Sequence, residues 1–114
     1  MDEIIREIFK MTKKYFEIHD EDISDDFIKL LIQSVVDEYK NLRNYPDSWD
    51  EDAIDADAER YFERRKANVA MVVIPEIYGK IGAEGLSMLT DAGTTRIWLA
   101  QKYMSDVVPF CELI

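Results

Sequence analysis

Cysteine and histidine are almost absent from this chain of 114 residues, which contains one of each. Cys111 has no second cysteine to pair with, which excludes an intramolecular disulfide, and the lack of a Cys/His cluster argues against a zinc site. This cysteine usage fits a reducing cytoplasm. We expect His19, alone among acidic residues, to be exposed, and Cys111 to be a small hydrophobe in a docking segment, because a catalytic thiol needs a histidine nearby.

Acidic residues outnumber basic ones. The chain has 14 Lys and Arg against 24 Asp and Glu, which gives a net charge of −10. Such a charge disfavours DNA reading and binding to an anionic membrane, since both depend on cations that neutralise phosphates. No apolar run approaches the roughly 18 residues of a membrane span, and the acidic start lacks the basic region of a signal peptide. We therefore expect a soluble protein with no membrane partner.

Apolar residues make up 47% of the chain, enough for one folded domain with a modest core. Apolar residues at spacings of three and four predict a helix over Glu3–Phe16. Ser24, followed by acids, predicts the N-cap of a second helix that extends to about Leu42. Proline, asparagine and aspartate then predict a loop over Asn41–Asp50.

The capping-box spacing of Ser48 and Glu51 predicts a third, long helix that reaches Val73. Pro75 lacks an N–H and clashes with the preceding turn, so we expect this helix to kink or to end near Val73. Gly79 and Gly82 are expected to stop it completely.

Beyond the glycines, an extended pattern predicts two strands, Leu86–Thr90 and Thr94–Leu99, joined by a turn that contains Gly93. Two isolated strands are marginal in water, so this hairpin is expected to complete itself against another chain. A last short helical turn around Pro109 is expected within Ser105–Ile114. The sequence thus predicts an all-α bundle of three main helices over residues 1–81, with a hairpin or extended arm over 82–114.

Three patterns suggest chemistry, and each has a simpler explanation. The run Asp47–Glu59 holds seven acids, but the calcium-loop spacing would place Arg60 where glycine is required, so we expect a solvated helix start. The glycines from Gly79 to Gly85 lack the lysine and the preceding strand of a phosphate loop. The basic cluster Arg64, Arg65 and Lys66 is either a solvated helix face or a contact to the acidic Asp47–Glu59 run of a neighbouring copy. We name no catalytic residue, no metal and no cofactor.

The segment Gly82-Ala83-Glu84-Gly85-Leu86-Ser87, which follows a predicted helix ending in Ile77-Tyr78, resembles a motif of the small head-tail connector proteins of tailed phages and prophages, also called adaptor or head-completion proteins. The later run that ends in Val108-Pro109-Phe110 and the second-helix start at Asp25–Gln33 are similar to that family as well. The resemblance spans nearly the whole chain.

The resemblance implies a structural, non-enzymatic protein of the virion, assembled in the bacterial cytoplasm. It would form a homo-oligomeric ring between the portal protein and a tail-side connector or stopper protein, with DNA passing through without specific binding. Residues 82–87 would form a loop that faces a neighbouring subunit or the portal, and Asp106–Ile114 would be a docking segment. The residues expected to make contacts are Gly82, Ala83, Glu84, Gly85, Leu86, Ser87, Trp98, Arg64, Arg65, Lys66, Val108, Pro109 and Phe110.

A second hypothesis from another class remains open. A small acidic regulatory or inhibitor protein could mimic DNA or occupy a basic site on a host protein. In that case exposed acidic side chains, rather than the glycine segment, would carry the binding.

Overall fold

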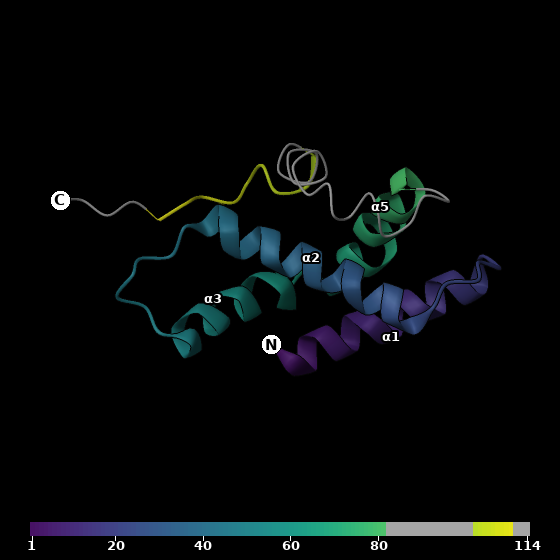
Figure 1. Ribbon diagram of the computed structural model, residues 1–114, viewed down its shortest axis with the longest axis horizontal. Helices are drawn as coiled ribbons and strands as arrows, with labels where there is room; N and C mark the ends of the chain where they lie inside the picture. The colour runs from purple at the N-terminus through teal and green to yellow at the C-terminus, as the bar shows by residue number, and fades with distance from the viewer. Residues whose placement is uncertain (82–101, 111–114) are drawn as a thin grey trace.

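The computed structural model describes residues 1–81 and 102–110, and residues 1–81 form an all-helical body (Figure 1). This confirms the predicted all-α bundle for the described part of the chain. The predicted strands Leu86–Thr90 and Thr94–Leu99 lie outside the described residues. The helices are α1 (Asp2–Ile18), α2 (Asp25–Arg43), α3 (Glu51–Glu63), α4 (Lys66–Asn68), the π-helix η1 (Val69–Val73) and α5 (Ile74–Ile81).

Helices α1 and α2 form where the apolar spacing predicts them. The Ser24 hydroxyl accepts the Phe27 N–H at 3.2 Å, which confirms Ser24 as the N-cap of α2. At its other end α2 stops at Asn44, whose φ of 52° is the left-handed conformation typical of helix ends. The next helix starts two residues later than predicted, because the Asp50 carboxylate, rather than Ser48, accepts the Ala53 N–H at 2.8 Å.

The predicted long third helix is wrong as a single element, because the chain leaves the helix at Arg64 and Arg65. The Arg65 N–H bonds the Phe62 carbonyl at 3.0 Å, three residues back, which tightens this turn. The helical path resumes at Lys66 and bends against α1 and α2. The break therefore turns one predicted helix into two packed segments.

Pro75 lies inside the second segment and does not end it. The Ile74 N–H bonds the Val69 carbonyl, five residues back, so a π-turn lies directly before the proline and adjusts the backbone around its missing N–H. Gly79 also lies within α5, which continues to Ile81; the expectation that Gly79 stops the helix is wrong.

The core lies where α1, α2 and the segment from α3 to α5 meet. Ile8, Leu31 and Phe62 are fully buried and represent its three sides. At one end, the Tyr78 ring of α5 lies 5.2 Å from Phe16 and 6.0 Å from Phe27, in edge-to-face geometry. The buried apolar residues are Ile4, Ile8, Phe16, Ile28, Leu31, Ile32, Val35, Val36, Tyr39, Ala58, Phe62, Val69, Ala70, Val73, Ile74, Ile77 and Met104.

Residues 102–110, which we call the tail segment, run along the opposite side of α2 from α1 and α3 (Figure 1). Its Met104 side chain joins the core. The predicted helical turn around Pro109 is wrong for the described part, because residues 107–110 are not helical. The Val107 N–H bonds the Met104 carbonyl at 3.1 Å, whereas the Val108 carbonyl and the Phe110 N–H bond Arg43 at the end of α2. Within residues 1–81 and 102–110, no helix is long and apolar enough to cross a membrane.

Candidate functional site

A buried carboxylate links helices α2 and α3. Asp57 lies on α3 and is only 5% exposed. It accepts hydrogen bonds from the hydroxyls of Tyr39 at 2.9 Å and Tyr45 at 2.8 Å, and from Nε and Nη2 of Arg43 at 3.1 Å each. We call Asp57, Arg43, Tyr39 and Tyr45 the Asp57 cluster. Because its donors come from α2 and from the loop after it, the cluster fixes how that loop leads into α3.

The protonation states of the cluster follow from its geometry. Burial alone would raise the pKa of the Asp57 carboxyl, but the hydrogen bonds from Arg43, Tyr45 and Tyr39 outweigh burial and hold that pKa at about 2. Burial and the bond to Asp57 raise the pKa of Tyr39 to about 12, and the same causes raise the pKa of Tyr45. At neutral pH the cluster is therefore a carboxylate with two neutral phenols and a cation, an arrangement that suits structure rather than proton transfer.

Arg43 also holds the tail segment. Its Nη1 donates to the Val108 carbonyl at 2.6 Å, and its guanidinium carbon lies 3.9 Å from the centre of the Phe110 ring. The Arg43 carbonyl accepts the Phe110 N–H at 2.8 Å. One arginine thus connects the buried carboxylate to the tail through both its side chain and its backbone.

Aromatic rings of the loop between α2 and α3 complete the docking site of Phe110. The Phe110 ring lies 4.8 Å from Trp49 and 5.8 Å from Tyr45, and the Asn44 amide approaches the Phe110 carbonyl at 3.4 Å. The predicted docking residues Val108, Pro109 and Phe110 therefore dock on their own chain in this structure. The Val108 side chain itself points outward and is 65% exposed.

The predicted basic cluster lies at the break after α3, and its members differ in their contacts. Arg65 donates to the Tyr61 carbonyl at 2.9 Å and to Asp106 of the tail at 3.2 Å, and it stacks on the Tyr61 ring. Lys66 bonds Glu63 at 3.2 Å and also bonds Glu7 of α1. Arg64 is exposed and makes no ion pair within residues 1–81 and 102–110.

Beside the Asp57 cluster lies a groove of about 580 Å³, which we call the arginine groove. The tail segment forms one wall through Asp106, Val107 and Val108, and α3 with the following turn forms the other. Four arginines line it, namely Arg43, Arg60, Arg64 and Arg65.

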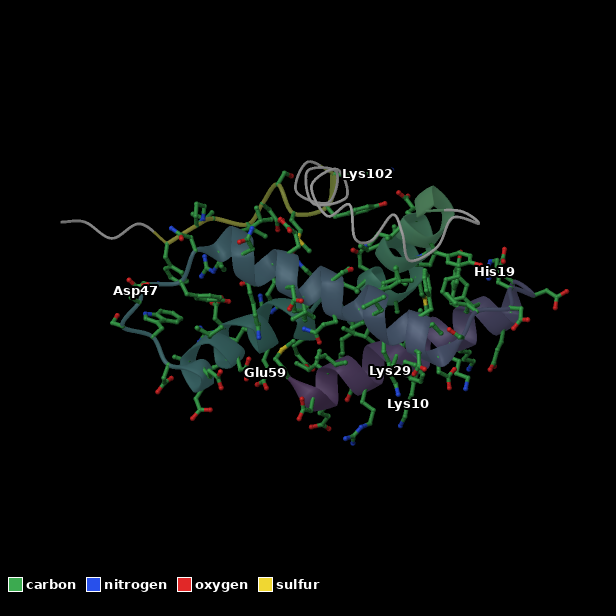
Figure 2. All side chains as sticks on the ribbon, viewed as in Figure 1. Lys10, His19, Lys29, Asp47, Glu59 and Lys102 are labelled. Carbon is green, nitrogen blue, oxygen red and sulfur yellow. The ribbon has the colours of Figure 1, made fainter. Side chains whose placement is uncertain are left out.

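The acidic run Asp47–Glu59 is not uniformly solvated as expected. Asp57 is buried, Asp55 pairs with Lys40 at 2.9 Å, Glu59 pairs with the N-terminal amine, and Asp50 caps α3. Figure 2 shows Asp47 at one end of the molecule and Glu59 near the start of α1. Among the described residues, no group of three or more His, Cys, Asp or Glu side chains could hold a metal ion.

Sequence reasoning missed the Asp57 cluster, although a signal was present. Asp57 lies three residues after Ile54 and four before Tyr61, within the apolar stripe of α3. An acid at such a position is buried and needs donors. His19 is exposed, as predicted. Gly82, Ala83, Glu84, Gly85, Leu86, Ser87, Trp98 and Cys111 lie outside the described residues.

The described part of the chain thus contains two neighbouring features, the docking site of Phe110 and the arginine groove beside it. In comparisons with known proteins, no family model, no curated protein and no solved structure matches this chain.

Proposed function

We propose that this protein is a head-tail connector of a tailed phage or prophage, which forms a ring between the portal protein and the tail-side components of the virion. The observation that carries the proposal is the segment Gly82–Ser87, which resembles the family motif. In the sequence the segment comes directly after Ile81, the last described residue of helix α5, and in that family the motif likewise follows a helix. An all-helical body is consistent with such a protein.

The tail segment gives the proposal a second support. Phe110 is held by contacts with Arg43, Trp49 and Tyr45, all close to one end of α2. Hydrogen bonds from Val108 and Phe110 to Arg43 hold the same segment, and on this proposal it exchanges these contacts for a docking site on a partner. Aromatic side chains in fitted pockets are the usual anchors of protein interfaces.

The observations weigh against the acidic inhibitor hypothesis. A DNA mimic needs rows of exposed carboxylates, but only three of the seven acids of Asp47–Glu59 are exposed and without a capping hydrogen bond or an ion pair among the described residues, while Asp50, Asp55, Asp57 and Glu59 are each engaged within the chain. Four of the seven acids of this run therefore contribute to the fold of their own chain. We accordingly expect no binding to a DNA-binding host protein through this run.

The test is co-sedimentation of the purified protein with DNA-filled heads of the phage that encodes it. Heads that carry the portal protein are compared with heads from which the portal has been omitted. We expect binding to the first and none to the second, and a ring at the portal vertex by electron microscopy. Absence of binding to portal-bearing heads, with a folded protein by circular dichroism, would overturn the proposal.

A further inference from the structure

The arginine groove concentrates positive charge on a strongly acidic chain. Four of the chain's six arginines line it, against three carboxylates, those of Asp57, Glu63 and Asp106. The groove is therefore locally positive although the whole chain carries a net charge of −10. Such a local reversal of sign favours an acidic occupant.

The four arginines fall into two pairs. Arg43 and Arg65 are fixed by contacts within the chain, to Asp57 and to Asp106 respectively. Arg60 contacts Asp57 only at 3.5 Å and its side chain is 75% exposed, while Arg64 has no ion pair within the described residues. Arg60 and Arg64 lie four residues apart and so lie near one another at the end of α3. Their side chains are exposed, so most of their N–H donors are open to solvent.

The start of α3 carries the complementary charge. Asp47, Glu51 and Asp52 are exposed, and none of them has an ion pair within residues 1–81 and 102–110. The Asp50 cap fixes the first turn of α3, so Glu51 and Asp52 lie on a rigid support. Three unpaired acids at one end of this helix thus match two arginines at the other end.

These charges cannot meet within one chain. Glu51 and Arg64 lie at opposite ends of α3, and thirteen residues of α-helix extend about 20 Å. That length far exceeds the reach of an ion pair, and the helix between them is part of the packed bundle. Only a second molecule can bring an α3 start to an arginine groove.

We infer that the arginine groove receives the first turn of helix α3 from a second copy of this chain, with Glu51 and Asp52 of that copy facing Arg60 and Arg64. The inference deepens the proposed function by naming a contact between neighbouring copies. It rests on the proposed function, because the ring is what brings a second copy next to the first. The contact pairs opposite charges locally, which gives a chain of this net charge a way to associate with itself.

A charge swap tests the contact. One variant carries Arg60→Glu with Arg64→Glu, and the other carries Glu51→Arg with Asp52→Arg. We expect the unmodified protein to self-associate in sedimentation velocity experiments over a range of concentrations. Each variant alone should associate at least about tenfold more weakly, because like charges then face each other. An equimolar mixture of the two variants should recover association, because each mixed contact again joins opposite charges.

The matched control reverses three acids at the other end of the molecule, Asp20, Glu21 and Asp22, to arginine, and it should not abolish association. Circular dichroism verifies folding, and Arg60→Gln with Arg64→Gln replaces the reversal if that variant does not fold. Any of three results would overturn the inference. The unmodified protein stays monomeric at all concentrations, the charge reversals leave its self-association unchanged, or the mixture of the two variants does not recover association.

Co-sedimentation with heads, run in parallel, separates this inference from the proposed function. Recovery by the mixture without binding to portal-bearing heads would refute the connector function and support the contact. Binding of the unmodified protein to heads, with association unaffected by the swap, would refute the contact and leave the connector function standing.

Discussion

Arg43 and Asp57 form a two-point ion pair in which Nε and Nη2 of the guanidinium each lie 3.1 Å from a carboxylate oxygen. The remaining nitrogen, Nη1, holds the Val108 carbonyl of the tail. This pair therefore couples the packing of α2 on α3 to the docking of the tail segment. Lysine carries a single ammonium group instead of a planar guanidinium, so Arg43→Lys would lose the two-point contact.

Replacement of Asp57 by asparagine should destabilise the fold. The change removes the charge that compensates the partly buried Arg43 and weakens the bonds from Tyr39 and Tyr45. Loss of one partner of a buried ion pair costs about 3 kcal/mol. Urea unfolding followed by circular dichroism measures the loss. Asp52→Asn, on an exposed face of the same helix, is the matched control and should change stability little; equal effects of the two variants would contradict the role of the cluster.

The stability that Asp57 contributes should depend on pH in a defined window. Its pKa is about 2 in the folded protein against an ordinary value of 3.8. A carboxyl with a lowered folded-state pKa stabilises fully above its unfolded-state pKa, and this contribution is lost as pH falls through the folded-state value. The difference between these two pKa values corresponds to about 2 kcal/mol of folding stability. The stability gap between the unmodified protein and Asp57→Asn should therefore be constant above pH of about 4.5 and narrow from there towards about 2.

The sequence predicts the first two helices of this fold but not the break after α3. Helices α1 and α2 follow from apolar spacing and from Ser24, since both signals are local. The break at Arg64 and Arg65 does not, because Phe62 and Val69 are seven residues apart and the apolar phase continues across it. No glycine or proline marks that break. It arises from packing of the following segment on α1, which no local pattern encodes.

The continuation of the helix through Pro75 could not be predicted from the sequence either. Proline normally argues for a helix end, and only the π-turn over Val69–Val73 lets the helix continue. The docking site of the tail could not be predicted from the sequence. The sequence predicts that Val108, Pro109 and Phe110 form a docking segment, but it does not show that this segment binds Arg43 and Trp49 of its own chain. That contact joins residues more than sixty positions apart.

Replacement of Phe110 by alanine should release the tail segment while leaving the bundle folded. The variant loses the stacking on Arg43 and Trp49, which is worth about 1 kcal/mol. With Trp98 replaced by phenylalanine in both proteins, Trp49 becomes the sole tryptophan, and its emission should shift to the red as it becomes more exposed. Val108→Ala is the control, because Arg43 binds the backbone carbonyl of Val108 and not its exposed side chain. An unchanged Trp49 spectrum in Phe110→Ala would contradict this docking.

Substitution of Gly85 should separate folding from assembly. In the sequence Gly85 lies in the segment that resembles the connector motif, and the buried core is formed by other residues. Gly85→Val should therefore leave helix content by circular dichroism nearly unchanged and reduce co-sedimentation with portal-bearing heads. Gly79→Ala provides the control, because Gly79 lies within α5 and an added methyl group meets no atom within 4 Å. That substitution should keep or slightly raise stability, by up to about 1 kcal/mol, and leave binding intact. Normal incorporation of Gly85→Val into heads would refute a role for the glycine segment in assembly.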